Sequence, residues 1–429
     1  MNNLKIFFNN STIQDKLTSI YINNNKYIIE INVRDILNYT LVKEINKIKK
    51  ILDVCDNLEL INILFNKNID SFLINVIITK LSNILYCYKP KYKIKLYSFS
   101  IKDNKINYIE NTTPSLMNEL ILYKDIVMNP NKDPENYLEY VKSRVPRNYN
   151  IQVNNLNIFK KFPLTESVGK GSRFNTYFVH IKPNLDDPLK KTIFLVGKSV
   201  TFDSGGLNLK TNNMEEMKTD MAGSAIIISV LNTLVLSGHD EKFNIHLLIP
   251  IVENMISNTA TRPGQIIKSC NSISVEITNT DAEGRLCLAD CLEYINNELL
   301  TDNCLIIDIA TLTGNAVSIT SEIASISMCN KKGEKYKDKL IQIGEDVGEY
   351  LEYLQLRPEY LDLLKSPVAD IKNLNLKTLA GCIIGGAFLH RFATNKCPWI
   401  HLDVAPTAFI NQVSTSYGVN LLVEFIKQL

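Results

Sequence analysis

The run TIFLVGK, residues 192–198, is apolar almost throughout and ends in a glycine and a lysine. It is too short for a typical helix, and its β-branched and aromatic residues favour a strand. Because apolar residues follow one another without alternation, the strand is expected to be buried on both faces, as in a parallel sheet covered by helices. The run therefore indicates an α/β protein.

Similar runs recur along the chain, with predicted helices at residues 214–236, 285–300 and about 380–393 between several of them. The runs are NTYFVHIK (175–182), NIHLLIPIV (244–252), CLIIDIA (304–310) and WIHLDV (399–404). Strands that alternate with helices predict a doubly wound, mixed but mostly parallel sheet flanked by helices. In such sheets ligands bind beyond the carboxyl ends of the strands.

The first part of the chain has a different pattern and carries no polar motif. Apolar spacing predicts helices at 36–52 and 70–87 and strands at 58–65 and 93–100. We therefore expect a smaller N-terminal α/β domain, residues 1–112, with an architectural or assembly role. Residues 113–429 form the predicted catalytic domain.

Composition argues against several classes of protein. The 429 residues include 47 basic and 45 acidic side chains, a net charge of +2 that gives no footprint for nucleic acid or a membrane surface. The nine cysteines form no CxxC pair, which predicts reduced thiols. The longest apolar run, AGSAIIISVLNTLVL (222–236), is too short to span a bilayer, and no secretory signal is visible. We expect a soluble cytoplasmic protein.

Charged side chains gather where predicted strands end. They are Lys198, Asp203 and Lys210 after the strand at 192–196, Asp220 at the entry of an apolar helix, and Asp281, Glu283 and Arg285 after the strand-like ISVEIT (273–278). Four carboxylates at one end of a sheet would repel one another strongly unless cations neutralised them. Two divalent ions carry the matching charge, and oxygen ligands suit zinc, manganese or magnesium.

The segment NTDAEGR (279–285) suggests how the acids share these ions. In an extended chain Asp281 and Glu283 would point the same way. Arg285 would lie on the same side and remain free to hold an anion. The apolar stripe of the following helix would anchor the segment to the core.

Other interpretations remain open. Taken alone, a DxE pair is usually a solvated surface feature, and an aspartate before a helix is usually an N-cap. VGKS at 196–199 resembles the end of a phosphate-binding loop, but that motif needs a glycine where Thr192 stands. No HExxH segment is present, which excludes the zincin motif. A non-catalytic scaffold and a nucleic-acid-binding role are the competing classes.

Four segments resemble the signatures of the M17 leucyl aminopeptidases, the two-metal cytosol aminopeptidases. They are GKSVTFDSGGLNLK (197–210), MKTDMAGSA (217–225), NTDAEGRLCLAD (279–290) and DIATLTG (308–314), and the resemblance covers roughly residues 113–429. It implies a metal-dependent aminopeptidase that releases N-terminal residues, preferably leucine-like, from peptides. It also implies a homohexamer.

The resemblance assigns roles to individual residues. Lys198, Asp203, Asp220 and Glu283 would hold one ion, and Asp203, Asp281 and Glu283 the other. The ions would be Zn²⁺, with Mn²⁺ or Mg²⁺ possible at the exchangeable site. Lys210 would steady the scissile carbonyl oxygen, and Arg285 would hold a bicarbonate that acts as general base. The substrate-binding residues would be Met217, Thr311, Leu312, Gly314 and Ala405.

Three positions depart from the family pattern. Ser199 and Ala222 stand where the family has glycine, and a positive φ at Ser199 would cost on the order of 1 kcal/mol. Ala408 replaces a bulkier residue, which predicts a wider or rearranged pocket. Every metal and catalytic position is intact, so we expect an active enzyme, the alternative being a catalytically weak or inactive family scaffold.

Overall fold

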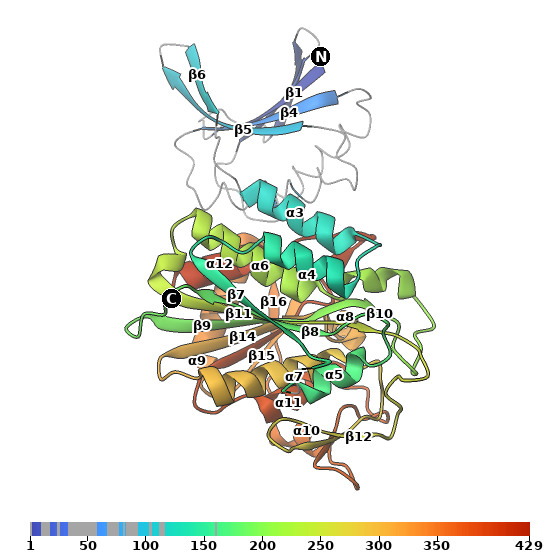
Figure 1. Cartoon of the computed structure of the whole chain (residues 1–429). Coiled ribbons are helices and arrows are strands. Elements are labelled where there is room, and N and C mark those ends of the chain that lie inside the picture. The colour runs from blue at the N-terminus through green and yellow to red at the C-terminus, as the bar shows by residue number, and fades with distance from the viewer. Residues whose placement is uncertain are drawn as a thin grey trace. The chain divides into compact units, whose positions relative to one another are not determined.

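A computed structural model describes residues 116–158 and 161–429 and, before them, the strands of the N-terminal part and helical pieces at 77–79 and 82. The chain divides into two compact units, residues 1–124 with 345–348 and residues 125–344 with 349–429. Figure 1 shows the elements of each unit. The division into functional domains near residue 112 stays a prediction.

The first unit contains a six-stranded sheet in the order β2-β3-β1-β4-β5-β6. Neighbours from β3 to β5 are parallel, and the edge strands β2 and β6 are antiparallel. The bounds are β1 (Asn2–Asn9), β2 (Thr18–Asn23), β3 (Lys26–Asn32), β4 (Leu58–Asn66), β5 (Lys93–Lys102) and β6 (Lys105–Glu110). The predicted strands correspond to β4 and β5. The helix predicted at 36–52 lies outside the described residues, as does most of the one at 70–87.

The second unit is built on a nine-stranded sheet in the order β16-β15-β18-β14-β9-β11-β8-β7, with β10 paired to β11. The strands are β7 (Tyr149–Asn155), β8 (Tyr177–Pro183), β9 (Lys191–Gly197), β10 (Ser199–Asp203), β11 (Phe243–Asn254), β14 (Cys304–Ala310), β15 (Ser325–Cys329), β16 (Leu351–Tyr353) and β18 (Trp399–Asp403). Strands β18, β14, β9 and β11 are parallel to one another, and β10 is parallel to β11. Strand β15 is antiparallel to β18 but parallel to β16, whereas β8 is antiparallel to β11 and β7 to β8. The predicted mixed, mostly parallel sheet is confirmed.

Helices cover both faces of this sheet (Figure 1). One face carries α4 (Pro134–Ser143), α6 (Ala222–Leu236) and α12 (Val419–Lys427), and the other carries α5 (Pro163–Gly169), α7 (Gly284–Tyr294) and α11 (Gly381–Phe392). The other α-helices of the described residues are α3 (Leu116–Met128), α8 (Gly314–Thr320), α9 (Glu334–Val347) and α10 (Pro358–Asp362). The core between α7, α11 and the sheet includes fully buried Phe194 and Trp399. Burial of the strands on both faces explains their unbroken apolar runs.

The helix predicted at 214–236 is broken in the middle. A 3₁₀ segment, Met214–Thr219, ends before Asp220, and α6 begins at Ala222. Among the described residues, Met214–Leu236 is the one stretch long and apolar enough to cross a membrane by length and composition, but 83% of its most apolar window is buried inside the protein. A buried core helix of a globular protein has the same composition. The break leaves Asp220 at a junction beside the sheet.

The strand that precedes NTDAEGR does not belong to the central sheet, contrary to the simplest interpretation of the sequence. It is β13 (Ser274–Glu276), which forms a small sheet with β12 (Ile266–Lys268) and β17 (Ile371–Lys372). A separate hairpin contains β19 (Phe409–Ile410) and β20 (Val413–Ser414). The apolar pattern predicted a strand correctly but could not assign it to a sheet, because the partner β17 lies far along the chain.

The expectation that all cysteines are reduced is wrong at one pair. Cys304 and Cys397 form a disulfide, with their Cα atoms 5.9 Å apart and 93 residues between them in sequence. Cys304 begins β14, and Cys397 lies just before β18, which pairs with β14. The free cysteines of the described residues are Cys270, Cys287, Cys291, Cys329 and Cys382. Sequence spacing could not reveal the pair because strand pairing brings it together.

Candidate metal centre and active site

A cavity of about 710 Å³ opens where four parallel strands of the central sheet end. Lys198 follows β9, Asp203 ends β10, Thr311 follows β14, and Ala405 follows β18. Every site residue predicted from the sequence lines this cavity: Lys198, Asp203, Lys210, Met217, Asp220, Asp281, Glu283, Arg285, Thr311, Leu312, Gly314 and Ala405. Its other lining residues include Glu216, Val317, Glu322 and Phe409.

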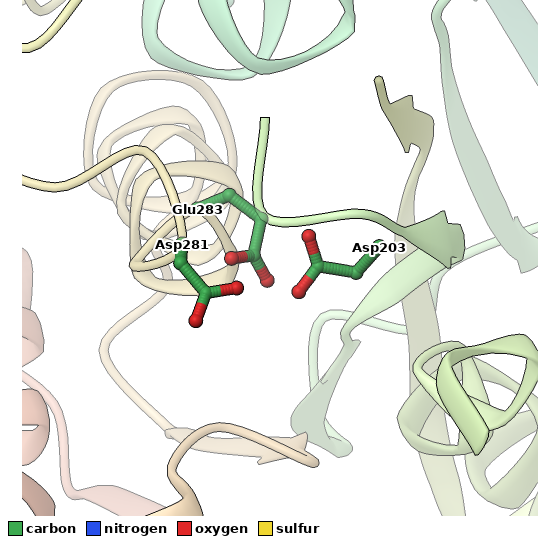
Figure 2. A group of neighbouring side chains, drawn as sticks. All are labelled: Asp203, Asp281 and Glu283. Atoms are coloured by element: carbon green, nitrogen blue, oxygen red, sulfur yellow. The ribbon is translucent and has the colours of Figure 1, made fainter. Parts of the chain in front are cut away.

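Three carboxylates face one another in the cavity (Figure 2). Asp203, Asp281 and Glu283 each offer an oxygen such that all of these atoms lie within 4.8 Å of one another. Asp203 and Glu283 are buried, and Asp281 is partly exposed. Three anionic groups so close together are stable only where cations balance them.

Lys198 supplies one of these cations. Its Nζ lies 2.7 Å from Asp220 Oδ1 and 2.9 Å from Glu283 Oε1, and it donates to Thr311 O over 2.8 Å. Burial opposes charge on this amine, but Asp220, Glu283 and Asp203 outweigh it and hold the pKa of Lys198 above its ordinary value. Gly284 leaves room for the side chain, because a Cβ there would lie 2.4 Å from Lys198 Cε.

Lys210 balances the other side of the cluster. Its Nζ lies 2.8 Å from Asp203 Oδ2 and 2.5 Å from Asp281 Oδ1. Burial again opposes the charge, but Asp203, Glu283 and Asp281 raise the pKa of Lys210. The turn before this lysine needs Gly205 and Gly206, which have φ of +86° and +63° and lie tightly against neighbouring atoms.

The chemistry of the donor set fits divalent cations. Burial, with the charge of Glu283 adding to it, raises the pKa of Asp203, Asp281 and Asp220, that of Asp220 to about 7, and a bound cation would offset these shifts. At Glu283 burial acts in the same direction, but Lys198 and Lys210 outweigh it and lower the pKa. Asp220 Oδ2 and Glu283 Oε2 are buried with no hydrogen-bond partner among the described residues. Such orphaned carboxylate oxygens are ligand positions for a hard or borderline ion.

The segment that carries Asp281 and Glu283 is not extended, so the alternation argued from the sequence is wrong. Asp281 lies in a turn, and Glu283 is helical, with φ −79° and ψ −39°, at the N-terminus of α7. Thr280 fixes this turn, because its N–H donates to Asn208 Oδ1 and its hydroxyl donates to Gly205 O. The two acids therefore converge through a turn into a helix.

Asn254, which the sequence analysis did not single out, lies behind the carboxylates. It ends β11, is 4% exposed, and donates from Nδ2 to Asp203 Oδ1 over 2.8 Å. The same nitrogen lies 3.0 Å from Thr280 O. The rule that polar residues at the carboxyl ends of strands gather at the site would have found it.

Arg285 is buried, with 3% of its surface exposed, in the wall of the cavity. Its Nη1 donates to Asn373 O over 2.7 Å, and its Nε has no partner among the described residues. Burial lowers the pKa of Arg285 to about 10, although Glu283 and Asp403 oppose the shift. A guanidinium with a spare buried donor and no carboxylate in contact is suited to an anion.

The loop after β14 connects the metal cluster to the rest of the wall. Thr311 donates its hydroxyl to Asp220 Oδ1 over 2.7 Å, and its carbonyl accepts from Lys198. Leu312 N donates to Asp403 Oδ1, so its N–H is already used. Leu312 lines the cavity, but its N–H is not available to a substrate.

The departures noted in the sequence are accommodated without backbone strain. Ser199 begins β10 and Ala222 begins α6, and neither has a positive φ. The Ser199 hydroxyl accepts from Ser224 Oγ over 3.1 Å. Ala408 is buried and is not among the described residues that line the cavity, whereas its neighbour Phe409 is. Phe409 therefore lies in the wall of the cavity, and the wider or rearranged pocket expected from Ala408 stays a prediction.

Fold and site together define a protein with a doubly wound α/β sheet and a candidate divalent-metal centre at its carboxyl edge. The family model described as "Cytosol aminopeptidase family, catalytic domain" matches residues 121–423. The chain belongs to this family.

Curated relatives share part of the sequence. A probable cytosol aminopeptidase of Prochlorococcus marinus is 39% identical over 272 residues, which is 61% of this chain and 54% of that protein. One from Rickettsia rickettsii is 35% identical over 320 residues, 71% of this chain and 63% of that protein. The matched region thus spans about half to two thirds of the length of these relatives.

Solved structures share the fold. The leucine aminopeptidase LAP1 of Caenorhabditis elegans has a TM-score of 0.79 and 24% identity, with 94% of this chain and 84% of that chain covered. The bottromycin maturation enzyme BotP, in complex with Mn, has a TM-score of 0.80 and 21% identity, with 100% and 99% covered.

Proposed function

We propose that this protein is a metal-dependent aminopeptidase, which hydrolyses the first peptide bond of peptides with a free N-terminus. The observation that carries the proposal is the convergence of Asp203, Asp281 and Glu283 within 4.8 Å, with Lys198 and Asp220 beside them, in one large cavity. Membership of the cytosol aminopeptidase family supports the same activity.

Two divalent ions are proposed to occupy the cluster. Asp203, Asp220 and Glu283 would hold one together with Lys198, whose amine would ligate only in its neutral form, after the ion's charge has displaced its proton. Asp281 with Asp203 and Glu283 would hold the other. Oxygen donors with one amine nitrogen suit Zn²⁺, and Mn²⁺ or Mg²⁺ at a more exposed position. Bound there, the ions supply Lewis acidity and a water of lowered pKa.

The protein's own side chains would complete the chemistry. Lys210 Nζ, freed from part of its pairing with Asp203 and Asp281, would donate to the oxyanion that develops on the scissile carbonyl. Arg285, with its spare Nε–H, would hold a bicarbonate that carries the proton from water to the leaving amine. The free α-amino group of the peptide would bind among the carboxylates, which explains a requirement for an unblocked N-terminus.

A leucine-like first residue is the proposed preference. Supporting it, the cavity wall contains apolar side chains beside the polar cluster: Met217, Leu312, Val317, Ala405 and Phe409. Apolar walls gain free energy by burying a branched aliphatic side chain. We further propose a cytoplasmic homohexamer, on the family resemblance and on the relatives' description as cytosol aminopeptidases.

The test compares leucine amide with N-acetyl-leucine amide on the purified protein, before and after chelation and after resupply of Zn²⁺ or Mn²⁺. The expected result is hydrolysis of the free amide alone, lost on chelation and restored by metal. Equal cleavage of the blocked amide would refute the aminopeptidase assignment. No turnover with any metal would favour the inactive scaffold.

A further inference from the structure

Asp403 is a buried carboxylate that lies behind the cavity wall and not in it. It is the last residue of β18, is 0% exposed, and is not among the described residues that line the cavity. In the parallel pairing of β14 and β18 it stands opposite Ala310, the last residue of β14. Asp403 therefore lies between two loops that leave the sheet side by side, residues 311–313 and 404–407.

The Asp403 carboxylate accepts hydrogen bonds from both loops. Leu312 N and Ala405 N donate to Oδ1 over 3.1 and 3.2 Å. The Thr313 hydroxyl donates to Oδ2 over 2.7 Å, and Cys382 Sγ from α11 approaches the same oxygen at 3.7 Å. A buried charge is costly unless donors surround it, and here the donors are the loops themselves.

These loops make up one wall of the cavity. Leu312, Thr313 and Ala405 all line it. The preceding residue, Thr311, contacts Lys198 and Asp220 through its carbonyl and hydroxyl. A shift of the loop 311–313 would therefore move this wall of the cavity, where the substrate is proposed to bind.

Helix α11 supports the same loop from another direction. At Gly385 a Cβ would lie 3.1 Å from Leu312 Cδ2 and 3.2 Å from Thr313 Cγ2. Contacts this close require the neighbouring atoms to move by a few tenths of an ångström. The loop is thus held by the Asp403 carboxylate and packed against a glycine of α11.

We propose that Asp403 is a positioning residue that sets how the cavity discriminates between first side chains of the substrate, by fixing the backbone of Leu312 and Ala405. This inference rests on the proposed aminopeptidase function. Asp403 would affect substrate selectivity through these two residues, without touching the substrate itself. Its alternative is a role in stability alone.

Asp308 offers a matched control. It is also 0% exposed and lies on the neighbouring strand β14. Its carboxylate accepts from Trp399 Nε1 over 2.6 Å and pairs with His401 Nδ1 over 2.5 Å. Neither partner is among the described residues that line the cavity. Asp308→Asn therefore perturbs a buried carboxylate of the same sheet without touching the wall.

The experiment measures kcat/KM for leucine amide and alanine amide, together with amide hydrogen exchange of residues 311–313, in full-length protein. For Asp403→Ala we expect the leucine-to-alanine ratio to fall about 10-fold, faster exchange at Leu312 and unchanged metal content. Asp403→Asn keeps an oxygen that can accept both N–H groups, so it should retain most of the ratio. Asp308→Asn should leave ratio and exchange as in the wild type.

If Asp403→Ala does not fold, Gly385→Ala provides a second test of the same loop. The added methyl group would displace Leu312 and Thr313 while Asp403 stays in place. We therefore expect this variant to change the leucine-to-alanine ratio of kcat/KM as well. A parallel loss for both amides in Asp403→Ala, or an Asp403→Asn variant as impaired as Asp403→Ala, would overturn the inference. Absence of turnover in the wild type would refute the proposed function, while the exchange at Leu312 would still test the positioning role.

Discussion

Asn254 Nδ2 donates to Asp203 Oδ1 over 2.8 Å, between the ends of two adjacent parallel strands. The same amide lies 3.0 Å from Thr280 O, just before Asp281. One buried side chain therefore orients a carboxylate from β10 and ties it to the turn that carries another. Such partners behind metal ligands fix ligand orientation and affinity.

Replacing Asn254 by alanine is expected to weaken metal binding about 10- to 100-fold, because Asp203 loses the donor that orients it. Competition with a chelator of known affinity measures this directly. Asn244→Ala is the matched control: Asn244 is equally buried at the other end of β11, where it pairs with residue Asp187. An unchanged affinity in Asn254→Ala would show that Asp203 needs no orienting partner.

Lys210→Ala should keep its metal and lose about 10²- to 10³-fold in kcat, the usual effect of removing one oxyanion donor. Lys210 pairs with Asp203 and Asp281, so its removal makes the cluster more negative and leaves all proposed metal ligands in place. Elemental analysis and steady-state kinetics on the same sample check both expectations. If the variant loses its metal, Lys210 is a structural residue.

Gly284→Ala should damage the site while leaving the fold intact. Its Cβ would meet Lys198 Cε at 2.4 Å and Nζ at 2.8 Å, and the lysine must then leave Asp220 and Glu283. Gly284 is the first residue of α7, and alanine is a better helix former than glycine, so the helix itself should not be weakened. We expect activity to fall at least 10-fold with little change in the melting temperature. Full activity would mean that Lys198 tolerates displacement.

A buried histidine predicts an acid-sensitive fold. Burial, with His246 and Lys182 adding to it, lowers the pKa of His180 from 6.5 to about 3. The unfolded chain takes up this proton near pH 6.5 and the folded chain only near pH 3. Stability from this site is therefore fully present above pH 6.5 and falls as the pH decreases to about 3, by at most about 1.4 kcal/mol per pH unit.

Denaturant unfolding of chelated protein at pH 4 to 7 measures this effect. His180→Gln should show a shallower decline of the free energy of unfolding with falling pH than the wild type. Identical slopes would show that His180 is not the residue responsible.

The sequence predicted the central sheet well, and the charged residues that it singled out line one cavity, because both features depend on local signals. Unbroken apolar runs identify strands such as β14, and polar residues at strand ends identify Lys198 and Asp203. It failed where non-local pairing decides the outcome. Strand β13 joins a separate small sheet, and Cys304 meets Cys397 only after β14 and β18 pair.

The sequence also could not predict the geometry within the site. The acids of NTDAEGR converge through a turn into α7, which alternation along an extended chain could not represent. Asp403 and Asn254 each end a buried strand, so the rule that found Asp203 applied to them too. They were passed over because neither lies in a charged cluster in sequence.

The central claim is that one cluster of side chains holds a pair of divalent ions. Elemental mass spectrometry of the purified protein, after dialysis against Zn²⁺ and removal of excess metal, tests it most directly. We predict two ions per chain, falling to one or none in Asp203→Ala, because Asp203 lies within 4.8 Å of both Asp281 and Glu283. One ion or none in the wild-type protein, or two retained in Asp203→Ala, would contradict the account.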